Sequence, residues 1–225
     1  MLKYLVIEST KKHTHTMFLL PGYSCSMLSM KYYTRNINKR LSDRIGIKFI
    51  IPQAPRRNVT CYQERAYCWY NYFTDYCDKE EIINYEHVLK MTETLKGMVE
   101  TEAEENLEND YSKIFIAGNS QGACQALHLA LSISRKLGGV VSFRGHVISN
   151  TSVENKHPVW ASHGEQDDAI GYKVATKGYD NLKDNGYNVA FHSEKYLDHY
   201  EHSNKEFDSC GEWINNLSNS KSSDN

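Results

Sequence analysis

Short, almost entirely apolar segments alternate with longer amphipathic segments along most of this chain. Three of the short segments are "IKFIIP" at 47–52, "KIFIA" at 113–117 and "PVWAS" at 158–162. Continuous apolar runs of this length are typical of strands that are buried on both faces. Because amphipathic stretches separate them, the order indicates a mostly parallel sheet covered by helices on both sides. We therefore predict an α/β fold.

Other elements are expected around these three strands. Residues 53–78 show no clean periodicity and are rich in aromatic residues, so we expect a long ordered excursion there. We expect a single domain over residues 1–217 and a disordered tail at 218–225, where apolar residues are scarce. The further predicted elements are strands at 3–8, 15–21 and 187–192, and helices at about 27–41, 79–105, 121–137, 172–182 and 203–217.

Composition argues against several classes of function. The net charge of −2 gives no global field for binding nucleic acid. The six cysteines include no CxxC pair and fit no zinc-site spacing, so no metal is expected. The apolar start is too short for a signal peptide, and no run approaches the roughly 18–20 residues that span a bilayer. These features predict a cytoplasmic chain with reduced thiols and without stable membrane insertion.

The segment "IFIAGNSQGACQALHLA" at 115–131 changes from strand to helix at its centre. Gly118 and Gly122 lie two positions on either side of Ser120, which fits the G-x-S-x-G nucleophile elbow. A sharp strand–turn–helix forces the serine into a strained conformation and needs small residues beside it. The amide of Gln121, at the positive end of the new helix, would point at a developing oxyanion.

A serine nucleophile needs a base and a carboxylate that orients this base. In hydrolases with this elbow, the acid and then the histidine follow the serine, each after a later strand. "HGEQDDAI" follows the strand at 158–162, and "SEKYLDHYEH", with His199 and His202, follows the last predicted strand. Both histidines are candidates for the base. This order favours catalysis over the alternative that Ser120 only caps a helix.

Several motifs resemble one family of enzymes. "GNSQGA" resembles the GFSQGG elbow, and "HGEQDDAI" the HGxxDxxV segment, of the acyl-protein thioesterase / phospholipase–carboxylesterase family of α/β-hydrolases. "IIPQAPRRNVT" and "YCWYNYF" are similar to a further stretch of that family. The similarity extends in pieces from about residue 15 to residue 213. It implies the α/β-hydrolase fold, with a mostly parallel central sheet and helices on both faces.

The resemblance also implies a set of site residues. Ser120 corresponds to the nucleophile, and Asp167, the fifth residue of HGxxD, to the carboxylate. Counting from the last predicted strand places the base at His199, and His202, expected at the surface near a helix start, is the alternative. The backbone amides of Tyr23 and Gln121 are implied as the oxyanion hole.

The function implied by the resemblance is hydrolysis of carboxylic esters or thioesters through an acyl-enzyme, with no cofactor and no metal. The expected substrate is an acyl ester or thioester, carried by a lipidated protein or a lysolipid. One alternative is a lysophospholipase-like esterase of small lipids. Another is a degenerate hydrolase fold that only binds, because the family's L-H-G-x-G-D loop is "LPGYSC" here, with Pro21 and Cys25 as departures.

Overall fold

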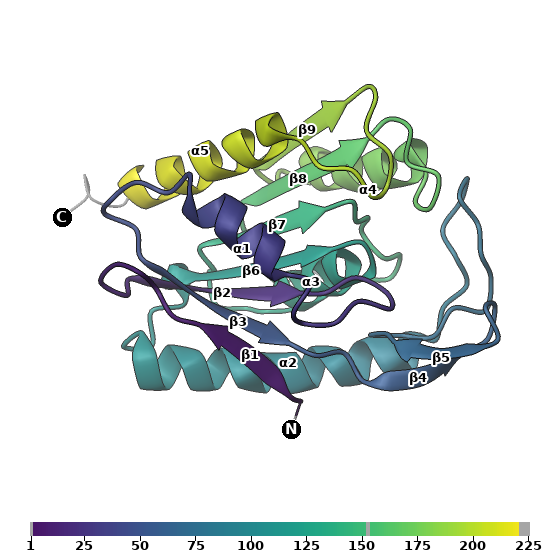
Figure 1. Cartoon of the computed structure of the whole chain (residues 1–225), viewed down its shortest axis with the longest axis horizontal. Helices are drawn as coiled ribbons and strands as arrows, with labels where there is room; N and C mark the ends of the chain where they lie inside the picture. The colour runs from purple at the N-terminus through teal and green to yellow at the C-terminus, as the bar shows by residue number, and fades with distance from the viewer. Residues whose placement is uncertain (1, 152–153, 221–225) are drawn as a thin grey trace.

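A computed structural model describes residues 2–151 and 154–220 of the chain (Figure 1). Within this part, seven strands form one sheet in the order β1-β3-β2-β6-β7-β8-β9. β1 pairs with β3 in antiparallel fashion, and the other neighbouring strands are parallel. The predicted mostly parallel sheet is confirmed. Its strands are β1 (Tyr4–Ile7), β2 (His15–Leu20), β3 (Ile47–Pro52), β6 (Ile114–Asn119), β7 (Gly139–Phe143), β8 (Val159–Gly164) and β9 (Val189–Glu194).

Helices cover both faces of the sheet (Figure 1). Two separate apolar clusters fill the spaces between the sheet and its two helical layers. One cluster includes residues of α1 and α5, and the other includes residues of α2, α3 and α4. The helices are α1 (Lys31–Asn38), α2 (Tyr85–Asn106), α3 (Gln121–Leu131), α4 (Tyr172–Asp184) and α5 (Asn204–Ser220), with a short 3₁₀ turn at Tyr111–Lys113.

Strand β2 shows why the central strands are apolar throughout. Met17 and Leu19 belong to the cluster under α1 and α5, whereas Phe18 and Leu20 belong to the opposite cluster. All four side chains are fully buried. Because successive side chains of a strand point to opposite faces, a strand between two helical layers needs apolar residues at every position. Each such side chain contributes about 1.5–3 kcal/mol of transfer free energy.

A buried ion pair joins the start of β3 to α2. Lys48 Nζ lies 2.5 Å from Glu102 Oε1, and the hydroxyl of Thr16 donates to the same carboxylate. Both charged side chains are almost inaccessible to solvent. Lys48 is the second residue of its strand, so the pair lies at the amino-terminal edge of the parallel sheet, opposite the edge where Ser120 follows β6.

The predicted boundaries differ from the structure at several elements. Residues 53–78 contain an antiparallel hairpin, β4 (Arg56–Val59) and β5 (Glu64–Tyr67), which the sequence did not indicate because its strands are short and largely polar. α2 begins at Tyr85 rather than at 79, because the side chain of Asn84 caps it. α1 and α3 are shorter than expected. α5 extends to Ser220, whereas residues 221–225 of the predicted tail lie outside the described part of the chain.

No helix in the described residues is long and apolar enough to cross a membrane.

Candidate active site

Ser120 occupies a strained turn between β6 and α3. Its φ is 53° and its ψ is −126°, a conformation that side-chain-bearing residues rarely adopt. A Cβ atom added to Gly118 would lie 2.3 Å from the carbonyl oxygen of Gly122, and one added to Gly122 would lie 2.2 Å from that of Leu20. Both flanking glycines are therefore required by close packing of the backbone. The turn projects Ser120 from the carboxyl edge of the sheet.

His199 connects Ser120 with a carboxylate. It lies in the loop after β9, and its Nε2 is 2.8 Å from Ser120 Oγ. On the other side of the ring, Nδ1 is 2.9 Å from Oδ1 and 2.8 Å from Oδ2 of Asp167. Since an ionised carboxylate only accepts hydrogen bonds, Nδ1 carries the proton and Nε2 accepts from the serine hydroxyl. This is the tautomer that a general base requires.

Asp167 is held in the turn that follows β8. Its Oδ1 accepts hydrogen bonds from the amides of Ala169 and Ile170, at 3.0 and 2.8 Å. His163 Nε2 lies 3.2 Å from Oδ2 and also donates to the carbonyl of Ile170. Burial alone would raise the pKa of Asp167, but the hydrogen bonds from His163 and His199 outweigh it and hold this pKa below the usual range. The carboxylate is therefore ionised at neutral pH.

His202 does not face the serine. Its Nδ1 is 2.8 Å from Glu206 Oε2, and its Nε2 is 2.7 Å from the hydroxyl of Tyr33. Burial and the charge of Arg144 lower its pKa to about 3, so the ring is neutral at physiological pH. The expectation that His202 lies at the surface was wrong, because only 12% of its side chain is exposed.

The loop at 20–25, "LPGYSC", passes beside the serine. A Cβ atom added to Gly22 would lie 3.3 Å from Ser120 Cβ, so this loop and the elbow are in close contact. The indole Nε1 of Trp69 donates to the carbonyl of Pro21 at 2.8 Å. Trp69 is fully buried. The departures from the family's loop thus leave a segment that is hydrogen-bonded to the chain after β5.

The side chain of Gln121 connects the start of α3 to the same segment after β5. Its Oε1 accepts from the amide of Trp69 at 2.8 Å, and its Nε2 donates to the carbonyl of Tyr70 at 2.9 Å. The hydroxyl of Tyr23 donates to Glu64 on β5. The backbone amide of Gln121 is the first of α3 and has no acceptor within the helix. The amides of Tyr23 and Gln121 therefore belong to two segments that are held together around the serine.

Sequence reasoning missed the buried polar side chains that support this site. Gln121 was considered only for its backbone amide, although a fully buried Gln at a helix start needs polar partners. Arg144 and Glu206, which are fully buried near His199, were not singled out. The available signal for Arg144 was one cation within the apolar segment "VVSFRGHVIS".

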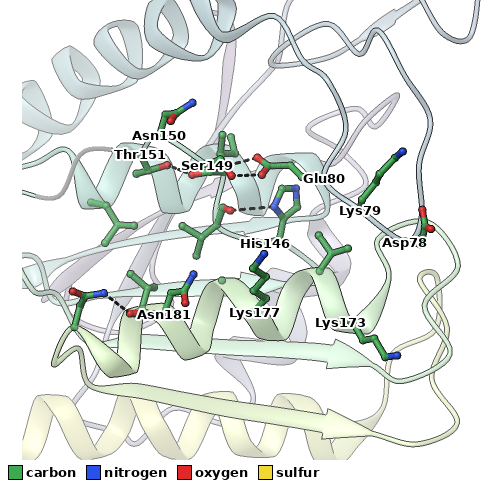
Figure 2. Close-up of a pocket in the computed structure, with 17 residues that line it drawn as sticks. Asp78, Lys79, Glu80, His146, Ser149, Asn150, Thr151, Lys173, Lys177 and Asn181 are labelled. Atoms are coloured by element: carbon green, nitrogen blue, oxygen red, sulfur yellow. Dashed lines mark hydrogen bonds between the residues drawn. The ribbon is translucent and has the colours of Figure 1, made fainter.

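A cavity of about 480 Å³ lies away from these groups, between α4 and the loop that follows β7 (Figure 2). Figure 2 shows Lys173 and Lys177 on the helix side and His146 and Ser149 on the loop side. The described residues that line it do not include Ser120 or its two partners. Across residues 2–151 and 154–220 there is no cluster of three or more His, Cys, Asp or Glu that could hold a metal ion.

Comparison with known proteins assigns the family. Residues 2–218 match the model of the phospholipase/carboxylesterase family. The chain is 24% identical over 204 residues to acyl-protein thioesterase 1 of Neurospora crassa, and the matched region covers 83% of this chain and 80% of that protein. It is 25% identical over 219 residues to mouse lysophospholipase-like protein 1, and the matched region covers 93% of this chain and 89% of that protein.

The fold is shared with solved structures. The crystal structure of Arabidopsis thaliana SOBER1 superposes with a TM-score of 0.80 at 23% identity, covering 91% of this chain and 99% of that one. The resemblance found in the motifs is confirmed by a family match that extends over nearly the whole chain. The chain belongs to the phospholipase/carboxylesterase family of α/β-hydrolases, and it is a hydrolase of carboxylic esters or thioesters.

Proposed function

We propose that this protein hydrolyses acyl esters and thioesters through a covalent acyl-enzyme, with Ser120 as nucleophile, His199 as general base and Asp167 as the carboxylate that orients it. The observation that carries the proposal is the pair of 2.8 Å contacts on either side of the His199 ring, one to the serine hydroxyl and one to the carboxylate. A nucleophile, a base and an orienting acid in this order are the requirements of acyl transfer by serine.

In the first half-reaction, Ser120 Oγ attacks the acyl carbonyl carbon and His199 Nε2 takes the hydroxyl proton. Asp167 stabilises the imidazolium that forms, because its carboxylate stays charged and accepts from Nδ1. The carbonyl oxygen becomes an oxyanion, which the amides of Tyr23 and Gln121 are proposed to bind. Loss of one such donor typically lowers the rate by about 10²–10³.

The leaving group departs as the tetrahedral intermediate collapses. His199 returns its proton to the leaving alkoxide or thiolate, and the acyl group remains on Ser120 as an ester. Water then enters, His199 takes its proton, and the hydroxide oxygen attacks the acyl carbon. Collapse of the second intermediate releases the carboxylic acid and returns the proton to Ser120, which regenerates the enzyme.

The proposed substrate class is a fatty acyl thioester on a protein. Its support is the similarity to acyl-protein thioesterase 1, whereas the similarity to lysophospholipase-like protein 1 favours a lysolipid ester as the second candidate. Measured kcat/KM values for an S-acylated peptide, a lysophosphatidylcholine and a p-nitrophenyl butyrate standard distinguish these classes. A preference of more than tenfold for the lysolipid would replace the proposed substrate and leave the mechanism unchanged.

Covalent labelling tests the nucleophile. A fluorophosphonate probe should label the wild-type protein once, at Ser120, and Ser120→Ala should remove both the label and ester hydrolysis. Ser134→Ala is the matched control, because Ser134 is exposed and lies beyond α3. An unlabelled and inactive wild-type protein would favour the degenerate binding fold. Activity of Ser120→Ala within about tenfold of wild type, about 1.4 kcal/mol of barrier, would mean that another nucleophile acts.

A further inference from the structure

Arg144 follows β7, and its guanidinium is fully buried. Its backbone has a φ of 55°, in the left-handed region that arginine seldom adopts. Burying a guanidinium is costly unless its N–H groups find acceptors, and a strained backbone persists only where the surroundings hold it in place. Both features direct attention to the groups that accept hydrogen bonds from the Arg144 guanidinium.

The guanidinium binds the loop that carries the proposed base. Its Nε donates to the carbonyl of Asp198 at 3.4 Å, and its Nη2 donates to the carbonyl of Glu201. These carbonyls lie one residue before and two residues after His199. Nη1 donates to the carboxylate of Glu206 on α5. Arg144 is therefore hydrogen-bonded to the backbone on both sides of His199.

Glu206 extends this contact to His202. Its Oε1 accepts from Arg144 and from the hydroxyl of Ser162, and its Oε2 accepts from His202 Nδ1. The other nitrogen of His202 accepts from the hydroxyl of Tyr33 on α1. His202, rejected above as the partner of Ser120, thus fixes the carboxyl-terminal end of the same loop.

The loop has two other sets of contacts, one to the turn after β8 through the Gln166 amide and the Leu197 carbonyl, and one within itself. The side chain of Asp198 accepts hydrogen bonds from the amides of Tyr200 and Glu201, which shapes a local turn. Tyr200 is 76% exposed, so it contributes little packing to this turn. A local turn of this kind defines the shape of the loop but not its distance from Ser120. The hydrogen bonds to Arg144 are what connect the loop to the end of β7.

We propose that Arg144, oriented by Glu206, is a positioning residue for the general base: it holds the His199 loop at the distance at which Nε2 meets Ser120 Oγ. This inference rests on the proposed role of His199 in catalysis. A misplacement of about 1 Å in a catalytic group can lower the rate by about 10²-fold. The competing explanation is that the buried ion pair stabilises the fold and does nothing for catalysis.

A double variant separates the two explanations. Arg144→Met leaves the carboxylate of Glu206 buried without a cation beside it, so both the melting temperature and kcat should fall. Adding Glu206→Gln removes that lone charge, so the melting temperature should rise again relative to the single variant. The carbonyls of Asp198 and Glu201 still lack their donor. We therefore expect kcat to stay at least thirtyfold below wild type, with KM changed by less than threefold.

Two further variants complete the test. Arg144→Lys keeps the charge opposite Glu206 but offers one nitrogen to two carbonyls, so kcat should fall at least tenfold with a smaller loss of melting temperature. Lys48→Met is the matched control, since it breaks a buried ion pair at the other edge of the sheet. It should lower the melting temperature and leave kcat per folded molecule unchanged.

The rate of fluorophosphonate labelling should follow kcat in every variant, because this reaction also needs the base near Ser120. Recovery of kcat to within threefold of wild type in the double variant, or wild-type kcat in Arg144→Lys, would overturn the positioning role. An equal loss of kcat in Lys48→Met would also overturn it, because general destabilisation would then explain the effect. If the wild-type protein itself proves inactive, the proposed function fails instead, so the two failures are distinguishable.

Discussion

Replacing Asp167 with Asn should nearly abolish turnover while leaving the fold intact. The change removes one negative charge and replaces one carboxylate oxygen by an NH₂ group. The remaining oxygen can still accept from the amides of Ala169 and Ile170, which are 3.0 and 2.8 Å from Oδ1 in the wild-type protein. Because these bonds shape the turn, the local backbone should persist. The expected loss of stability is about 1–2 kcal/mol, the usual effect of weakening hydrogen bonds to a charged group.

The effect on catalysis follows from the hydrogens on His199. With its amide oxygen toward Ala169, the new Asn places its NH₂ group at the Oδ2 position, 2.8 Å from Nδ1, and this donor favours the tautomer in which Nδ1 accepts a hydrogen bond. The imidazole proton moves to Nε2, so the atom that faces Ser120 can no longer take a proton. In serine proteases, the same inversion of the tautomer lowers kcat by about 10⁴, or about 5 kcal/mol of barrier. We expect a loss of 10³–10⁴-fold by the same reasoning.

Asp168→Asn is the matched control, because it makes the same chemical change at the next residue. Asp168 is exposed, whereas Asp167 is buried. Steady-state hydrolysis of p-nitrophenyl butyrate, with active sites counted beforehand, gives kcat for both variants, and thermal unfolding reports their stability. Asp168→Asn should remain within about threefold of wild type, or about 0.65 kcal/mol. Equal losses in the two variants, or a larger one at Asp168, would refute the reasoning.

Three further predictions address the loop, the elbow and the response to acid. His202→Ala should lower the melting temperature and reduce kcat less than His199→Ala does; equal losses of kcat would contradict this. Gly122→Ala should unfold or grossly destabilise the protein, because its Cβ would lie 2.2 Å from a carbonyl oxygen, while Gly97→Ala, with nothing within 4 Å, should add about 0.5–1 kcal/mol in urea unfolding. Burial lowers the pKa of His128 to about 4, so the folded state holds this side chain neutral. The free energy of unfolding is therefore unaffected by His128 titration above the unfolded pKa of about 6.5, and it decreases by about 3 kcal/mol as the pH falls from there toward 4. His128→Gln should reduce the pH dependence of the urea midpoint over that range.

The architecture was predictable because burial on two faces leaves a clear mark on the sequence. Strand β3 was expected at 47–52 and occupies Ile47–Pro52, since every position of "IKFIIP" is buried. The hairpin of β4 and β5 left no such mark. Half of the residues in its segments "RRNV" and "ERAY" are charged and half are exposed, so neither hydrophobic periodicity nor strand propensity reveals them. Pairing between the two segments forms these strands, and each buries only one residue, Val59 or Ala66.

The choice between His199 and His202 could not follow from local pattern. Both lie in one loop without periodicity, three residues apart. Their surroundings come from distant parts of the chain: His199 contacts Ser120, while His202 contacts Tyr33 on α1. Such long-range contacts depend on how separate elements of the chain meet at one edge of the sheet. Motif counting gave a preference for His199, and only the packing of the whole chain assigns a partner to each ring.

The same argument applies more strongly to Arg144, which no motif indicates. The register of the sheet pairs Asn119 with Phe143, so Ser120 and Arg144 follow at matching positions on neighbouring parallel strands. Both have a positive φ, at 53° and 55°. Each such residue costs on the order of 1–3 kcal/mol, and strain of this kind persists only where surrounding contacts compensate for it. The amide of Ser120 donates to the carbonyl of Phe143, and the amide of Arg144 donates to that of Ser162, so each strained residue is hydrogen-bonded to the next strand.

Strain at two adjacent strand ends has a direct geometrical consequence. The regular strand conformation of β6 and of β7 ends at Asn119 and Phe143, which are paired. The side chains of Ser120 and Arg144 therefore leave the sheet from neighbouring positions. One carries the proposed nucleophile, and the other carries the guanidinium that binds the loop of the proposed base. In the proposed positioning role, Arg144 connects the His199 loop to the strand beside the one that carries Ser120. The loop is also bound to the turn after β8, through the hydrogen bonds of His199 to Asp167 and of the Gln166 amide to the Leu197 carbonyl. Ser120 can be recognised from a sequence motif because glycines must flank it. For Arg144 the sequence shows only one arginine within an apolar segment.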